Sequence, residues 1–326
     1  MSTEGDHHRV VGRPPRRQSL VSVLDALVLA ELAFLALLAA FAPRPVAGQG
    51  CRVLAWARGA AGGQRAAQYG RHLVRNGLPL APEESPARAV RDLRAREYES
   101  RVETLRGYLP WRSRPKVTLT GAEHIRAGLA AGNGAVLWVV QSTGSDLAAK
   151  IALHSAGFEV THLSRPTHGY SGSRLGVRFI NPVKTRLEDR YLLARAVIGA
   201  DSPTAALRQL HRALAANGVV SFTAVDHAAT VTTVPFGDRR LRVAEGAPQT
   251  ARGRGASLLP VFTERLRAGE FRVEVQAPIA IAAGKAGMDA ALTDFAARLA
   301  AYLERNARDW SGWRNGSVAP KSGAGG

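Results

Sequence analysis

The chain has 326 residues, of which 46% are hydrophobic, and it carries a formal net charge of +18. This length can bury one sizeable core, or one core with a helical appendage, and the single cysteine, Cys51, excludes a disulfide framework. The positive charge favours an anionic membrane surface, an acidic carrier protein or nucleic acid. Only 6% of residues are aromatic and no nucleic-acid motif is present, so we expect no nucleic-acid partner.

Residues 1–19 form a polar, basic tail, and residues 20–42 are almost wholly apolar up to Pro43. The apolar length predicts a helix that can span a bilayer, and the basic flank predicts a cytoplasmic N-terminus. Asp25 and Glu31 oppose this prediction, because an acidic side chain near the bilayer centre costs up to about 3 kcal/mol. We expect a membrane anchor helix or a deeply seated interfacial one; a core helix of the soluble domain and a cleaved signal peptide are the alternatives.

Residues 43–115 predict a helical segment with a break at residues 79–86, and residues 116–316 then alternate between strand and helix signals. The predicted strands cover residues 116–119, 135–140, 159–163, 219–224, 232–236, 257–264 and 271–276. The predicted helices cover residues 122–131, 147–155, 190–197, 204–216 and 288–306, and residues 317–326 are expected to form a loose tail. The alternation predicts an α/β fold with a mostly parallel sheet that helices cover on both faces.

The predicted strand at residues 135–140 ends at Gln141, and Asp146 follows five residues later in a turn that opens the next helix. An amide cannot take up a proton at neutral pH, but it can donate a hydrogen bond to a carbonyl or to a developing oxyanion. Asp146 also suits a capping role near the start of the helix. The turn is therefore a candidate site that offers a carboxylate and a hydrogen-bond donor.

The Gly/Ser-rich loop of residues 165–176 carries four polar side chains that suit a site, Arg165, His168, Ser171 and Arg174. Guanidinium groups bind phosphate through two parallel hydrogen bonds, and an imidazole takes up protons near neutral pH. In an exposed loop the same residue types are often only solvated. His168 is the first candidate for a general base, and His227, beside Asp226, is the second.

Taken together, these segments resemble the lysophospholipid and lipid A acyltransferase superfamily, and the resemblance runs from the N-terminal helix to Trp313. In that family the turn after a buried strand carries a catalytic histidine and a carboxylate separated by four residues. Here Gln141 stands at the histidine position and Asp146 at the carboxylate position. The other similar segments are the loop that starts at His162-Leu163-Ser164-Arg165-Pro166, the run Val234-Pro235-Phe236-Gly237, the strand that contains Pro260-Val261, and Asp309-Trp310-Ser311-Gly312-Trp313.

The resemblance implies transfer of a fatty acyl group from an acyl carrier protein or coenzyme A thioester to a hydroxyl of a glycolipid or lysophospholipid, at the cytoplasmic face of a bacterial inner membrane. We expect Gln141, Asp146 and His168 to be the catalytic residues. The residues expected to bind the acceptor are Arg165, Ser171, Arg174 and Asp226. The alternative is a family member that has lost catalysis and binds lipid or glycolipid in envelope or polysaccharide assembly.

General-base catalysis contributes about 10²–10⁴-fold, so a chain without the family histidine is slow, uses another base, or is inactive. No Cys/His spacing suggests zinc, no Gly-x-Ser-x-Gly elbow suggests a serine hydrolase, and no Gly-x-Gly-x-x-Gly follows a strand. We therefore expect neither a metal ion nor a cofactor.

Overall fold

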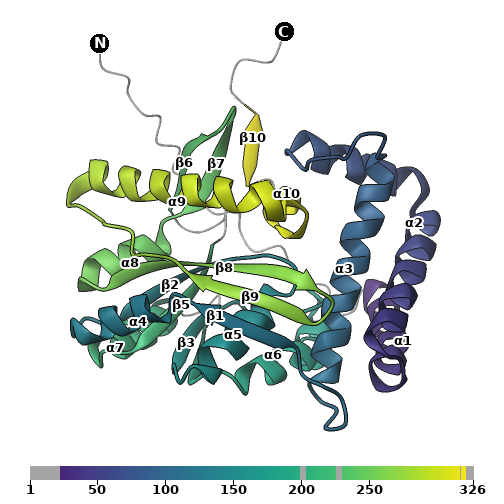
Figure 1. Cartoon of the computed structure of the whole chain (residues 1–326), viewed down its shortest axis with the longest axis horizontal. Helices are drawn as coiled ribbons and strands as arrows, with labels where there is room; N and C mark the ends of the chain where they lie inside the picture. The colour runs from purple at the N-terminus through teal and green to yellow at the C-terminus, as the bar shows by residue number, and fades with distance from the viewer. Residues whose placement is uncertain (1–22, 199–202, 225–229, 316, 321–326) are drawn as a thin grey trace.

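Three helices precede an alternation of strands and helices in the computed structural model, which describes residues 23–198, 203–224, 230–315 and 317–320 (Figure 1). The helices are α1 (Val23–Phe41), α2 (Arg44–Arg75), α3 (Pro86–Arg106), α4 (Ala122–Ala130), α5 (Ser145–Ser155), α6 (Pro182–Asp189), α7 (Pro203–Ala215), α8 (Gly246–Arg254), α9 (Gly284–Asn306) and α10 (Gly312–Asn315), with the short helices η1 (Gly176–Ile180) and η2 (Ala307–Asp309). The strands are β1 (Lys116–Thr120), β2 (Ala135–Val140), β3 (Val160–Ser164), β4 (Ala194–Val197), β5 (Val219–Ala224), β6 (Val231–Phe236), β7 (Arg239–Ala244), β8 (Ser257–Arg267), β9 (Glu270–Val275) and β10 (Val318–Pro320). The predicted basic tail, residues 1–19, lies outside the described residues.

Seven strands form the main sheet in the order β1-β9-β8-β2-β5-β3-β4. Strands β8, β2, β5, β3 and β4 run parallel to one another, whereas β9 is antiparallel to β8 and parallel to β1. A second, antiparallel sheet contains β10, β7 and β6. The prediction of an α/β fold with a mostly parallel sheet is therefore confirmed.

The central strands β2 and β5 are buried on both faces, as expected for parallel strands between two layers of helices. Side chains alternate along β2, so that Trp138 packs in a core with α7, α8 and α9, whereas Leu137 packs in a core with α4 and α5. The Trp138 ring stacks on Phe295 of α9, with 3.8 Å between the ring centroids. This packing leaves only the ends of the strands open to a site.

The predicted helix at residues 190–197 is wrong. The helix α6 comes earlier and begins at Pro182, whose fixed φ and missing N–H suit a first helical turn. Ala194–Val197 form the edge strand β4, which pairs in parallel with β3. A short apolar run is ambiguous between helix and strand, and here pairing with β3 decides the outcome.

Some elements are not predicted by the sequence patterns, among them β7 and α8. The expected loose tail is also wrong in part, because Val318–Pro320 form β10 and pair with β7. Residues 321–326 lie outside the described range. Strands as short as β10 carry too few residues for a period of two to stand out.

Helix α1 turns its two acidic residues toward the protein. Glu31, which is 7% exposed, accepts a hydrogen bond from Tyr98 Oη at 2.8 Å and pairs with Arg58 and Arg101 at 3.1 and 3.2 Å. Burial, reinforced by the nearby Glu31 carboxylate, raises the pKa of Tyr98 to about 12. Asp25, which is 3% exposed, accepts hydrogen bonds from the loop after β3.

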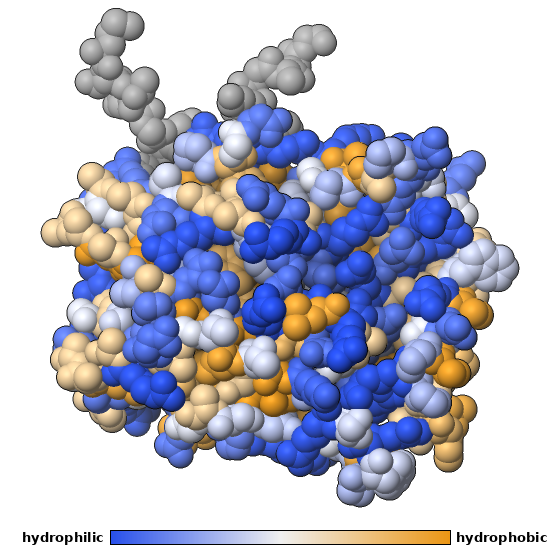
Figure 2. All heavy atoms as spheres, in the orientation of Figure 1, coloured by the Kyte–Doolittle hydropathy of each residue, from blue (hydrophilic) through white to orange (hydrophobic). Residues whose placement is uncertain are grey.

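The outer side of α1 is apolar. All the exposed residues that the structure describes on this helix are apolar, namely Ala26, Leu29, Ala30, Ala33, Phe34, Leu37 and Phe41. On the face shown in Figure 2, by contrast, hydrophilic residues dominate around α3. No helix within the described residues is both long and apolar enough to cross a membrane, so the spanning anchor predicted at residues 20–42 is without support.

Replacing Phe295 by Ala should leave a cavity between α9 and the sheet, because the Trp138 ring loses its stacking partner. We expect the free energy of unfolding, measured by urea denaturation, to fall by about 3–5 kcal/mol. Phe41→Ala removes the same side chain from a position that is 77% exposed, and should change the free energy by less than about 0.5 kcal/mol. Equal losses in the two variants would contradict the assignment of the core.

Candidate functional site

The carboxyl ends of the parallel strands meet at one pocket of about 660 Å³. Gln141 follows β2, Arg165 follows β3 and Ile198 follows β4, and all three residues line this pocket. Ligands of open α/β sheets bind at this edge, and pockets of about 300–1,000 Å³ hold small ligands. The pocket is therefore the candidate functional site.

The pocket has an apolar part and a polar part. The apolar part is lined by Trp138, Leu163, Ile198, Leu207, Phe222 and Ala247. The polar part includes Gln141, His162, Ser164, Arg165, His168 and Lys184. Among the lining residues that the structure describes none is acidic, whereas Arg165 and Lys184 are cations. The pocket therefore suits a ligand that combines an apolar portion with a negative charge.

His168 is bound to a buried carboxylate that no sequence pattern predicts. Its Nε2 atom lies 3.0 and 3.2 Å from the two carboxylate oxygens of Glu188, which is 1% exposed. An ionised carboxylate only accepts hydrogen bonds, so Nε2 is the protonated nitrogen of the neutral ring and Nδ1 keeps its lone pair. Nδ1 makes no hydrogen bond within the described part of the chain. The imidazole is thus held by one nitrogen and offers the other as an acceptor.

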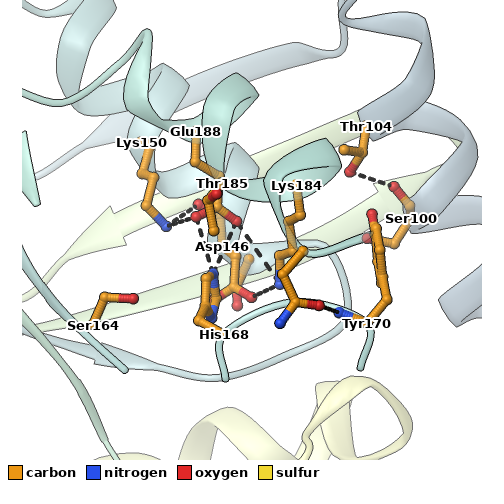
Figure 3. A network of polar contacts seen from close by, with 12 residues as sticks. Ser100, Thr104, Asp146, Lys150, Ser164, His168, Tyr170, Lys184, Thr185 and Glu188 are labelled. Carbon is orange, nitrogen blue, oxygen red and sulfur yellow. Dashed lines mark hydrogen bonds and ion pairs between the residues drawn. The ribbon is translucent and has the colours of Figure 1, made fainter. Parts of the chain in front are cut away.

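Glu188 also pairs with three cations, one on its own helix and two on neighbouring elements, and Figure 3 shows the two lysines among them. Arg195 of β4 pairs with it at 2.9 Å, Lys150 of α5 lies 3.3 Å away, and Lys184 of α6 lies 3.8 Å away. A buried charge is stable only when such partners replace its lost hydration. Because the partners come from separate elements, Glu188 fixes α5, α6 and β4 against one another.

Asp146 lies in the first turn of α5 and belongs to the same charge network. Its Oδ2 accepts a hydrogen bond from Lys184 Nζ at 2.6 Å, and Asp189 pairs in a similar way with Arg195 at 2.7 Å. No side chain caps the start of α5 by a hydrogen bond, so Asp146 is not an N-cap, but it is the acidic residue of the first turn, where a negative charge suits the helix dipole. Asp146, Glu188 and Asp189 thus pair with the three cations Lys150, Lys184 and Arg195.

The cations determine the charge state of both buried carboxyl groups. Burial by itself would raise the pKa of Glu188, but Lys150 and Lys184 outweigh it and hold that pKa well below its ordinary value of 4.5. Burial would also raise the pKa of Asp146, but Lys184, His168 and Lys150 together outweigh it and hold that pKa below its ordinary value of 3.8. Both groups are therefore ionised at neutral pH.

A metal ion fits this cluster poorly. The ligand atoms of Asp146, His168 and Glu188 lie within 4.8 Å of one another, which is close enough to share an ion. Their carboxylate oxygens, however, already face the two lysines and the arginine of the network. A divalent ion placed there would stand beside three fixed positive charges. The donor set fits an internal charge network better than a metal centre.

Gln141 is held in place by the closing segment of the chain. The backbone N–H and the Oγ of Ser311 donate hydrogen bonds to the main-chain oxygen of Gln141 at 3.0 and 2.9 Å. The same Oγ lies 3.3 Å from Gln141 Oε1. The side-chain NH2 group of Gln141 has no hydrogen-bond acceptor within the described residues, and the residue lines the pocket. Gln141 can therefore donate a hydrogen bond to a ligand.

The remaining predicted site residues do not all converge. Arg165 lines the pocket, whereas Arg174 is exposed and is not among the lining residues. The Ser171 hydroxyl donates to Asp25 Oδ1 of α1 at 2.5 Å. Asp226, with the second candidate base beside it, lies outside the described residues. The structure thus brings together Gln141 and Arg165 with the His168 loop, and it places Arg174 elsewhere.

A second histidine, His162 of β3, also lines the pocket. Its Nδ1 lies 2.8 Å from the Oγ of Ser221 on β5, and its side chain is buried. Burial, together with the nearby Lys150 ammonium, lowers the pKa of His162 well below its ordinary value of 6.5. His162 is therefore a neutral hydrogen-bonding group of the pocket at pH 7.

Nothing in the composition singles out the cluster around Glu188, because the chain contains 44 lysines and arginines and 26 acidic residues. One sequence pattern, the spacing of oppositely charged residues along a helix, indicates part of this cluster. Asp146 and Lys150, like Lys184 and Glu188, are four residues apart, which places both members of each pair on one face of a helix. The convergence of these faces depends on tertiary packing, which helical spacing does not report.

No protein-family model matches this chain, and no curated protein matches it either. Membership in a family is therefore not shown, and the chemistry of the pocket is the basis for any assignment.

Replacing Glu188 by Gln should leave Lys150 and Arg195 buried without their carboxylate. We expect the free energy of unfolding at pH 7 to fall by about 3–5 kcal/mol. Because the pKa of Glu188 is lower in the folded protein, its stabilising effect is present above the unfolded value of 4.5 and is lost as the pH falls toward the folded value. The variant should therefore lose less stability than the wild type on acidification below about pH 4.5, by up to about 1.4 kcal/mol per pH unit.

Urea denaturation at a series of pH values measures both effects. Glu123→Gln, which removes an exposed carboxyl group from the first turn of α4, is the matched control and should retain the wild-type dependence on pH. An unchanged acid slope in the Glu188→Gln protein would contradict an ionised, charge-stabilised Glu188.

Proposed function

We propose that this protein transfers a fatty acyl group from an acyl carrier protein or coenzyme A thioester to a hydroxyl of a glycolipid or lysophospholipid. The observation that carries the proposal is the pairing of His168 with Glu188 at the edge of a pocket that also contains Gln141 and an apolar wall. This pairing supplies a proton acceptor in a chain that has Gln at the position where similar acyltransferases have His. The sequence resemblance to the superfamily supports the same reaction.

His168 acts as the general base in this proposal. Its Nε2–H donates to Glu188, which fixes the tautomer and leaves Nδ1 to accept the proton of the acceptor hydroxyl. The carboxylate then stabilises the imidazolium that forms. The arrangement has the same logic as a histidine–carboxylate pair in other acyl-transfer sites, where a carboxylate orients the base.

The reaction proceeds through a tetrahedral intermediate. The acceptor oxygen attacks the thioester carbonyl carbon while its proton moves to His168 Nδ1. The side-chain NH2 of Gln141 donates a hydrogen bond to the oxyanion that develops on the carbonyl oxygen. Collapse of the intermediate breaks the carbon–sulfur bond, and the departing thiolate takes the proton from the His168 imidazolium. The products are an ester and a free thiol.

The pocket lining supports an anionic lipid substrate. The apolar side chains of Trp138, Leu207 and Phe222 suit a hydrocarbon chain, and Arg165 suits a phosphate. No acidic side chain stands among the described lining residues to repel such a group. The lining of the pocket is therefore complementary both to an anionic headgroup and to an acyl chain.

His168→Ala should lower the rate of acyl transfer by about 10²–10⁴-fold, because the base is removed. The assay mixes the purified protein with an acyl carrier protein or coenzyme A thioester and a lysophospholipid or extracted glycolipid, and it measures free thiol. His154→Ala, on the exposed side of α5, is the matched control and should keep the wild-type rate. Full activity in His168→Ala would contradict the role of His168 as base.

Lipid binding without catalysis is the second candidate function. Two observations favour it: Gln141 cannot accept a proton, and the Asp146 carboxylate is bound to Lys184 at 2.6 Å. Such a protein would act in envelope or polysaccharide assembly by holding a lipid or glycolipid in the pocket. The same assay separates the two functions, since the binding protein would release no thiol with any of the donor and acceptor pairs.

We also propose that the protein attaches to the cytoplasmic face of a bacterial inner membrane through α1 and the start of α2. The first half of α2 also exposes large apolar side chains, Val46, Val53 and Trp56, which are 51–63% exposed. An apolar helical face of this kind suits the interface of a bilayer, and a net charge of +18 favours anionic lipid.

Leu37→Glu should weaken attachment, because it places a charge in the middle of this apolar face, where Leu37 is 60% exposed. Flotation with vesicles that contain phosphatidylglycerol measures the bound fraction, and we expect the partition coefficient to fall at least about tenfold. Leu193→Glu changes a leucine that is also 60% exposed, between α6 and β4, where Tyr191 and Leu192 pack in cores that contain no residue of α1 or α2, and it should keep the wild-type coefficient. A wild-type protein that does not float with these vesicles would contradict attachment.

A further inference from the structure

The loop between β3 and η1, residues 165–175, brings His168 to the pocket and is fixed on one side by Asn181. Asn181 Oδ1 accepts hydrogen bonds from the backbone N–H groups of Tyr170 and Ser171 at 2.7 and 2.9 Å, and its Nδ2 donates to the Ser171 carbonyl at 2.9 Å. Gly169 has φ +152°, and a Cβ there would lie 2.5 Å from Asn181 Cβ. This contact requires glycine next to His168.

The other side of the loop is fixed by α1. One carboxylate oxygen of Asp25 accepts from Ser171 Oγ at 2.5 Å, and the other accepts from Ser173 Oγ at 2.7 Å. Ser171 Oγ in turn accepts from the N–H of Ser173, and Ser173 Oγ accepts from the N–H of Gly176. The buried carboxylate of Asp25 therefore accepts hydrogen bonds from two hydroxyls. These hydroxyls in turn accept hydrogen bonds from the backbone N–H groups of Ser173 and Gly176.

A second connection runs from the same helix to the same loop. Glu31 of α1 pairs with Arg101 at 3.2 Å, and the Arg101 guanidinium lies over the ring of Tyr170, 5.1 Å from its centroid. Tyr170 is two residues from His168 in the chain. Both acidic residues of α1 thus act on the segment that carries the candidate base.

We propose that Asp25 is a positioning residue, which fixes Ser171 and Ser173 so that His168 stays against Glu188 and faces the pocket. The order of the loop follows from the contacts alone, whereas the effect on catalysis rests on the proposed function. Asp25 is distant from His168 in the sequence and does not line the pocket, so it acts through the loop and not on a substrate.

Asp25→Ala in the full chain tests this role with two measurements that need no activity. Hydrogen exchange of peptides that cover residues 165–176 should rise at least about tenfold, since the hydroxyls lose their acceptor. The rate at which diethyl pyrocarbonate modifies His168 should rise as well. Asp25→Asn should stay near the wild type in both, because its amide keeps an oxygen acceptor for one serine hydroxyl and presents an NH2 donor to the oxygen of the other.

Ser171→Ala with Ser173→Ala removes the other half of the contact and leaves Asp25 in place. This double variant should reproduce both changes, and adding Asp25→Ala to it should have no further effect. Asp294→Ala removes a surface carboxylate that pairs with Arg298 on α9, and as a control should change neither measurement. If Asp25→Ala does not fold, the serine variant still decides the outcome.

Unchanged exchange of residues 165–176 and unchanged modification of His168 in these variants would overturn the proposal. So would a rise in exchange that spreads equally over β2 and α5, because that result indicates general destabilisation. For the reaction, we expect kcat to fall at least about tenfold in Asp25→Ala, with KM for the thioester within about twofold and rescue by Asn. A full kcat despite a loosened loop would overturn the positioning role, whereas an inactive wild type with the expected exchange would overturn the proposed function and leave the order of the loop confirmed.

Discussion

The candidate site depends on one buried carboxylate, Glu188. A carboxylate that is 1% exposed is tolerable only if charged and hydrogen-bonding partners replace the water it has lost. Arg195, Lys150 and Lys184 supply positive charge, and His168 supplies a hydrogen bond. Each partner comes from a different place in the sequence, so satisfying Glu188 forces β4, α5, α6 and the His168 loop into one arrangement. This arrangement places His168 and Lys184 in the polar part of the pocket.

Helix α1 lacks the polar outer side that a helix at a protein surface usually has, although it also buries Leu35 and Ala39 against the protein. A soluble helix buries its apolar side and leaves polar residues in water, whereas α1 buries Asp25 and Glu31 and exposes leucine, phenylalanine and alanine. The two acidic residues that oppose a membrane helix in the sequence are the ones that bind this helix to the rest of the protein. The apolar side is thereby left without a charge, and contact with lipid would not require either carboxylate to lose its partners.

The regular elements could be predicted because burial imposes a period on the sequence. The central strands β2 and β5 and the helices α7 and α9 follow from apolar runs and helical spacing alone. The helix α6 and strand β4 could not, since a short apolar run fits either state and pairing with β3 decides it. His168 could be selected for its chemistry in a Gly/Ser loop, but its partner Glu188 lies 20 residues away among many charged residues. The sequence predicts that Ser171 binds the acceptor. The structure instead shows its hydroxyl bound to Asp25, a contact that the sequence pattern does not indicate.

In the proposed reaction, Gln141 and the His168–Glu188 pair have complementary roles. Strands β2 and β3 are separated by β5, so their ends stand about 9–10 Å apart, two strand spacings. The loop after β3 brings an imidazole nitrogen of His168 within 4.8 Å of the Asp146 carboxylate, which lies in the helix that follows β2. Asp146 itself is paired with Lys184 at 2.6 Å. His168, on the loop, is paired with its own carboxylate, Glu188, and Gln141 lines the same pocket. In the proposed reaction His168 on the loop is therefore the proton acceptor, and Gln141 at the end of β2 is the hydrogen-bond donor to the oxyanion.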